Sequence, residues 1–133
     1  MRFFSILSFI FFTIVSENVV AQDNIDKYKK IVEKNLRNAS TDELVWVRAF
    51  NNTYDKYCKS HQTYEIFKYF YEVASSTIVD ELIDRNEFTA SWQGKYGFRK
   101  GYLKGFRKRV GTDGLCQCIY NHIIAGDSSC LPQ

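Results

Sequence analysis

The strongest constraint on the fold is a long stretch of sequence, from Gln22 to Gln93, that contains neither glycine nor proline. These two residue types most often mark turns and end regular structure. The stretch is also rich in lysine, glutamate, leucine and tyrosine, and three of these are good helix formers. Such a sequence favours helices joined by short polar turns, and we therefore predict an all-α fold.

Hydrophobic residues recur in this stretch three and four residues apart, which is the spacing of one helix face. Ser40 and Glu43 have the spacing of a capping box, which predicts the start of a second helix. Beyond the stretch, Gly111 is the expected end of a fourth helix. The prediction is a small disulfide-stapled bundle of four long helices plus a short C-terminal helix. The expected helices cover about residues 23–38, 41–59, 63–86, a fourth through the segment before Gly111, and 114–125.

The segment from Gly94 to Arg109 differs from the rest of the chain, because it holds seven basic residues, four glycines and no acidic residue. On a helix its glycines form one stripe and its aromatic residues form the next. Each interior glycine costs a helix about 0.5–1 kcal/mol relative to alanine. Close packing against another helix of the bundle is the most frequent way to offset this cost. A groove for a ligand or partner, or a partly non-helical segment, is the alternative.

The charge of this segment is not shared by the remaining chain. The formal net charge of the protein is +3, so the residues outside the segment are net negative, with acidic side chains concentrated between residues 65 and 87. A solvated face is the commonest role of such a charge run. Docking onto an acidic protein surface is the functional role that we prefer, because Tyr, Phe and Arg are frequent interface anchors. The predicted contact residues are Phe98, Arg99, Lys100, Tyr102, Lys104, Phe106, Arg107 and Lys108.

Residues 1–21 have the features of a secretory signal peptide. A basic start precedes an apolar run from Phe3 to Val15, and short side chains lead to an expected cleavage after Ala21. The run is shorter than the roughly 18 apolar residues that a membrane-spanning helix needs. We therefore expect a signal peptide over 1–21 and one α-helical domain over 22–133, secreted or periplasmic, with no transmembrane segment after cleavage.

All four cysteines follow the predicted signal peptide: Cys58, Cys116, Cys118 and Cys130. An even number of cysteines in an exported chain predicts two disulfides. Cys116 and Cys118 are too close in a helix to bond to each other without strain, which leaves two pairings. We favour Cys58–Cys116 with Cys118–Cys130, because Cys116 shares the apolar face of the last predicted helix. The other pairing stays open.

Two histidines offer a zinc site as the alternative to disulfides. Cys58 with His61, and Cys118 with His122, have spacings that a tetrahedral Cys₂His₂ site could use. Export favours disulfides, which also account for the other two cysteines. The sequence contains no recognisable nucleophile context and no phosphate-binding loop. We therefore predict a protein that is not an enzyme and has no catalytic residue, metal or cofactor.

A short motif adds to the functional prediction. The segment from Gly101 to Gly105, with a cysteine near the C-terminus, is similar to small periplasmic helical immunity proteins over a handful of residues. We predict a binding protein that engages or neutralises a partner protein with an acidic surface, as an inhibitor, immunity factor or effector; no nucleic-acid partner is expected. One alternative is a cationic protein that binds polyanions or anionic membrane surfaces. Another is a carrier whose cavity is lined by the aromatic residues of 64–71.

Overall fold

The structure is a computed structural model that describes residues 22–87 and 90–130. The described part is all-α and consists of helices α2 (Gln22–Arg37), α3 (Thr41–Tyr57), α4 (Tyr64–Asp84) and α5 (Ala90–Ile123). The predicted signal peptide lies outside the described residues. Among the helices described, none combines the length and the apolar character that crossing a membrane requires. The all-α fold class is thus confirmed.

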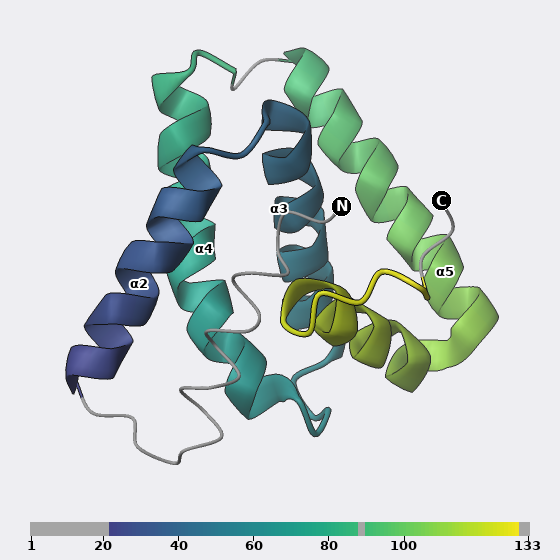
Figure 1. Ribbon diagram of the computed structural model, residues 1–133. Helices are drawn as coiled ribbons and strands as arrows, with labels where there is room; N and C mark the ends of the chain where they lie inside the picture. Colours follow the sequence, from purple (N-terminus) through teal and green to yellow (C-terminus); the bar gives the residue numbers. More distant parts are fainter. Residues whose placement is uncertain (1–21, 88–89, 131–133) are drawn as a thin grey trace.

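Helix α3 occupies the centre of the bundle (Figure 1). Helix α5 packs along one side of α3, α4 packs against α3 from another side, and α2 packs on α4. The acidic helix α4 and the basic helix α5 are therefore separated by α3. This order of the helices decides which charges can meet.

The start of α3 follows the predicted capping box. The Ser40 hydroxyl accepts a hydrogen bond from the Glu43 backbone N–H at 3.1 Å, and it donates one to the Glu43 carboxylate, also at 3.1 Å. These bonds satisfy a backbone donor that the first helical turn leaves without a partner. The turn between α2 and α3 is therefore set by local sequence.

Aromatic side chains fill the core around α3. Phe50, Tyr54, Phe67 and Phe70 are almost fully buried. The rings of Tyr54 and Phe67 stack with centroids 3.9 Å apart, and Phe67 meets Phe70 at 5.8 Å. Burying each such side chain contributes about 1.5–3 kcal/mol. The aromatic cluster of α4 thus packs on its neighbours and serves as core.

The expected fourth and fifth helices form a single element, α5, that turns sharply at Gly111 (Figure 1). Gly111 has φ 85° and ψ 167°, a backbone region that essentially only glycine adopts. The break was predicted at this residue, but helical structure resumes directly after it and ends at Ile123. The expected division into four long helices and a separate short one therefore differs from the structure. We call residues 90–110 the first arm of α5 and residues 112–123 the second arm.

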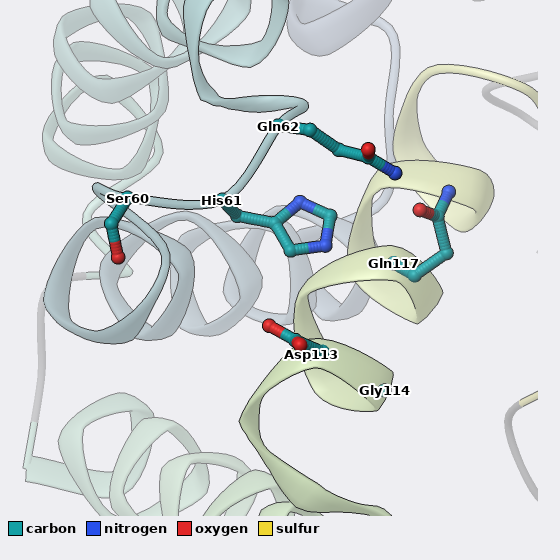
Figure 2. A pocket seen from close by; sticks show the side chains of 6 residues that line it. All are labelled: Ser60, His61, Gln62, Asp113, Gly114 and Gln117. Atoms are coloured by element: carbon teal, nitrogen blue, oxygen red, sulfur yellow. The ribbon is translucent and has the colours of Figure 1, made fainter.

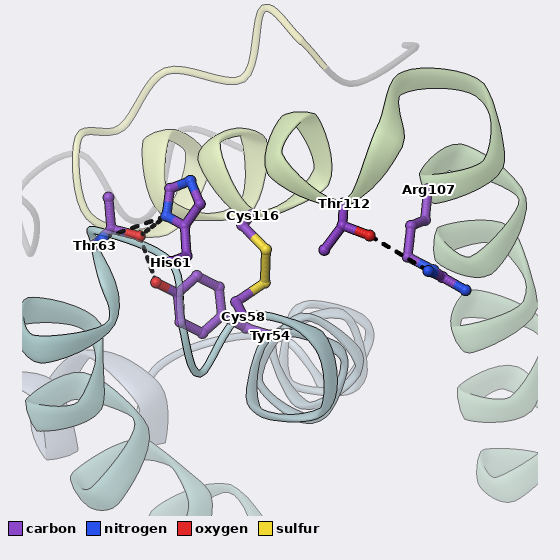
Figure 3. Close-up of a disulfide and its surroundings, with 7 residues drawn as sticks. All are labelled: Tyr54, Cys58, His61, Thr63, Arg107, Thr112 and Cys116. Atoms are coloured by element: carbon purple, nitrogen blue, oxygen red, sulfur yellow. Dashed lines mark hydrogen bonds between the residues drawn. A yellow bond between two sulfur atoms is a disulfide. The ribbon is translucent and has the colours of Figure 1, made fainter.

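Two disulfides fix the second arm. Cys58 bonds to Cys116, with Cα atoms 5.7 Å apart, and Cys118 bonds to Cys130, with Cα atoms 5.8 Å apart. The first bond attaches the second arm to the end of α3 (Figure 3). The favoured pairing is confirmed, and it leaves no thiolate for the zinc alternative. Two disulfides also fit an oxidising environment outside the cell.

Candidate functional site

One side of the first arm packs on α3. Leu103 is fully buried, and Trp92 and Phe106 are nearly so. The half-buried Tyr102 ring meets the Trp46 ring of α3 edge-on, with centroids 5.9 Å apart. Two of the predicted contact residues, Phe106 and Tyr102, are therefore largely used to join α5 to α3.

Two of the predicted contact arginines also interact inside the molecule. The Arg99 guanidinium pairs with the Asp42 carboxylate and lies 4.9 Å from the centre of the Trp46 ring, so only 11% of its side chain is exposed. The Arg107 guanidinium lies 4.1 Å from the centre of the Tyr57 ring. Cation–π contacts of this kind contribute about 0.5–2 kcal/mol, more where water is excluded. Both arginines therefore hold the first arm on α3.

We call the contact between α3 and the first arm the seam. A row of polar residues on α3 completes it, and these residues were not among the predicted site residues. The Arg48 guanidinium lies over the rings of both Trp92 (5.6 Å) and Tyr96 (5.4 Å). Asn52, one turn further along α3, donates a hydrogen bond to the Tyr96 hydroxyl. Lys56 follows after another turn. Arg48, Asn52 and Lys56 follow one another at intervals of four residues, which places them on one helix face. This spacing was the signal in the sequence that could have identified them.

The side of the first arm that carries the glycines is largely open to solvent. Phe98 is 76% exposed. A methyl group at Gly94, Gly97, Gly101 or Gly105 would meet no described atom within 4 Å. The expectation that another helix of the bundle packs closely against these glycines is therefore wrong. We call this surface the open face; it consists of Gly94, Gly97, Phe98, Lys100, Gly101, Lys104, Gly105 and Lys108.

The open face keeps its positive charge. In the acidic helix α4, Glu81 pairs with Arg37 and Arg85 at 3.1 and 3.0 Å, and α3 lies between α4 and α5. Within residues 22–87 and 90–130, the ion pair that the first arm forms is Arg99 with Asp42. The exposed lysines of the open face therefore have no carboxylate partner among the described residues.

A polar pocket of about 510 Å³ lies where the turn after α3 meets the second arm. Figure 2 shows the His61 ring pointing from this turn toward the second arm. Its Nδ1 atom is 2.8 Å from the Thr63 hydroxyl, which also bonds to the Tyr54 hydroxyl (Figure 3). Burial raises the pKa of Tyr54 to about 12, so this phenol stays neutral near pH 7. The lining residues are Ser60, His61, Gln62, Asp113, Gly114 and Gln117.

This pocket offers hydrogen-bonding side chains and one carboxylate, Asp113. Covalent catalysis requires a nucleophile within hydrogen-bond reach of a base. Among the hydrogen bonds of the described residues, none joins His61 to Ser60 or Asp113. The described bonds of the His61 ring go to Thr63, and its backbone bonds to Cys58 and Tyr64, so His61 stabilises the turn between α3 and α4. The pocket therefore has the properties of a structural junction that is open to solvent.

No protein-family model matches the chain, and no curated protein or solved structure matches it significantly. Function must therefore be inferred from the molecule itself. Of the surfaces described above, the open face is the one whose composition has no explanation within the bundle.

Proposed function

We propose that this chain is an exported binding protein that engages or neutralises a partner protein through the open face of α5. The observation that carries the proposal is the uncovered glycine stripe. Each glycine costs the helix about 0.5–1 kcal/mol relative to alanine, and no described part of the chain covers these positions. A partner backbone that approaches the first arm closely would supply the missing contact.

The residues beside the glycines suit a protein with an acidic surface. Phe98 is an exposed apolar anchor next to the stripe, and aromatic residues are enriched at protein interfaces. Lys100 and Lys104 lie on the other side of the stripe without carboxylate partners. An acidic partner would pair with these lysines at the rim, and long-range attraction would speed its association. An inhibitor, an immunity factor and an effector can all act through such a contact.

Site-specific photocrosslinking tests the proposal. A photoreactive phenylalanine analogue is placed at Phe98, and as a control at Ile83, which is 56% exposed on α4. We expect a discrete crosslinked product from position 98 and none from position 83. A Gly101→Leu substitution should weaken this crosslink about tenfold or more, because its side chain blocks close approach. A matched Lys95→Leu substitution on the same helix, outside the open face, should leave it unchanged.

Two results would contradict the proposal. Equal crosslinking from positions 98 and 83 would show that Phe98 has no privileged contact. A partner captured equally well by the Gly101→Leu chain would show that the stripe does not need to be approached closely. Circular dichroism of each variant would establish that the helices are retained.

The same unpaired lysines favour one second candidate, a protein that binds polyanions or anionic membrane surfaces. Such binding would depend steeply on salt, since each lysine releases counterions when it meets an anionic group. Heparin and anionic vesicles at increasing salt are the test. Binding that is absent at low salt would remove this candidate.

A further inference from the structure

We infer that the seam between α3 and α5 holds a binding site for a tetrahedral oxyanion, namely a phosphate or sulfate group. A pocket of about 230 Å³ opens there, with four lining residues from α3 and three from α5. This inference goes beyond the proposed function, because it concerns a small anionic group and uses residues of α3 that lie outside the open face. Either proposal can fail without the other.

Three lysines from the two helices line this pocket: Lys56 of α3, and Lys100 and Lys104 of α5. No acidic residue lines it, and none of the three lysines forms an ion pair within the described part of the chain. Like charges on side chains that line one pocket repel one another. An anion bound between them would replace this repulsion with attraction, and charge-assisted hydrogen bonds to ammonium groups are strong.

The remaining lining residues suit a small polar anion. Thr53 provides a hydroxyl, and Asn52 provides an amide whose orientation is set by its hydrogen bond to Tyr96. Gly101 has no side chain to fill the pocket. The volume is below the roughly 300–1,000 Å³ that is typical for drug-sized ligands. The pocket therefore fits one anionic group with water, and a larger ligand would have to extend into solvent.

The phenol of Tyr57, which also lines the pocket, responds to the same positive charge. A hydrogen bond from Lys56, together with the charges of Lys56, Arg107 and Lys104, lowers the pKa of its phenol. The Lys56 ammonium lies 5.2 Å and the Arg107 guanidinium 4.1 Å from the centre of the Tyr57 ring. An oxyanion in the pocket would offset these charges and raise the Tyr57 pKa back toward its ordinary value.

The experiment is a titration of the folded chain with inorganic phosphate and with sulfate at low ionic strength, followed by NMR of backbone amides and of labelled tyrosine rings. We expect saturable shifts confined to residues 52–57 and 100–104, and an upward shift of the Tyr57 pKa. Lys56→Glu should lower the affinity about tenfold or more. Lys95→Glu makes the same charge change at an exposed position of α5 that does not line the pocket, and it should change the affinity less than about twofold.

Three outcomes would overturn the inference: no binding, equal loss of affinity in both variants, or an affinity that Lys56→Glu does not change. Lys104→Glu provides a second test from the other helix and should match Lys56→Glu. Heparin, which carries sulfate groups, and phosphatidylglycerol vesicles, which carry phosphate groups, then show which kind of molecule brings the anionic group to the pocket. If binding of heparin or of the vesicles depends on Lys56 but not on Lys95, that molecule binds through the pocket. If binding of both were equally sensitive to the two substitutions, diffuse surface charge would explain it and the site would be excluded.

Discussion

The two arms of α5 follow one another directly across the non-helical Gly111, yet their surroundings differ. The second arm carries Leu115, Cys116 and Ile119, all fully buried, and two disulfides hold it in place. The first arm buries one side against α3 and leaves its glycine stripe uncovered. Glycine therefore has two roles in this helix. The backbone requires it at Gly111, whereas nothing described in the bundle requires it in the stripe.

This difference separates the part of α5 that stabilises the fold from the part that is available for binding. The second arm is a fixed point, because Cys58–Cys116 attaches it to the central helix. The first arm is held on α3 by Arg99 and Arg107 and presents the opposite side to solvent. Substitutions in the two arms should accordingly have effects of different size and, for glycine, of opposite sign.

The largest effect is expected from the disulfide that attaches the second arm to α3. Cys58 and Cys116 are 58 residues apart, and loop-closure entropy assigns such a bond about 4 kcal/mol of stability. Replacing both with alanine should lower the free energy of unfolding by about that amount, measured by urea denaturation. The matched Cys118→Ala/Cys130→Ala chain opens a separation of 12 residues and should lose about 3 kcal/mol. A larger loss in this control would contradict the assigned role of Cys58–Cys116.

The next largest effect is the pH dependence of the free energy of unfolding, which we attribute to His122 in the second arm. His122 is 1% exposed, its ring lies 5.0 Å from that of Phe50, and burial lowers its pKa to about 4. The unfolded chain has an ordinary histidine pKa near 6.5 and binds the proton more readily between pH 4 and 6.5. The contribution of neutral His122 is therefore complete above about pH 6.5 and is lost as the pH falls toward 4. The loss is on the order of 3 kcal/mol.

Urea denaturation between pH 4 and pH 7.5 measures this dependence. A His122→Gln chain should show a shallower fall of stability with falling pH than the wild type. The control is His61→Gln, at a half-exposed position in the polar pocket. If the wild-type and His122→Gln curves ran parallel, burial of His122 would not be the source of the slope.

At the junction of the arms, Gly111→Ala should destabilise the protein. An alanine side chain is strained at φ 85° and ψ 167°, a cost of about 1–3 kcal/mol. Thermal denaturation followed by circular dichroism would measure it. A stability equal to that of the wild type would mean that the chain can change direction here without a glycine.

In the first arm, Gly101→Ala should have the opposite sign and the smallest size. Its methyl group meets no described atom within 4 Å, so the substitution should raise the free energy of unfolding by about 0.5–1 kcal/mol. The same thermal denaturation measures it beside Gly111→Ala. A destabilised Gly101→Ala chain would show that the stripe is covered after all and would end the distinction between the arms.

Much of the local structure could be predicted from the sequence. Ser40 and Glu43 determine the start of α3 through bonds that span only three residues. Gly111 determines the break in α5 because the required backbone conformation excludes other residues. The favoured cysteine pairing was also confirmed: Cys58, which caps the end of α3, and Cys116 of the second arm are both fully buried where the two elements meet.

The candidate site depends on information that no local pattern contains. Helical periodicity places Phe98, Phe106 and the glycines on particular sides of the first arm, but it does not show which side α3 covers. In the structure Phe106 is buried, Phe98 is exposed and the glycines have no close neighbour. The seam also brings Lys56 of α3 beside Lys104 of α5, residues that are far apart in the chain.

The amino-acid sequence by itself determined the helices, the cap at Ser40 and the break at Gly111, because these follow from interactions between residues a few positions apart. The tertiary structure alone decided that α3 separates the acidic helix α4 from the basic helix α5. The physical reason is that the order of the helices depends on how the apolar faces of distant segments pack together. The positions of the charged side chains are a consequence of that packing. The glycine stripe and its lysines therefore remain uncovered by the described chain.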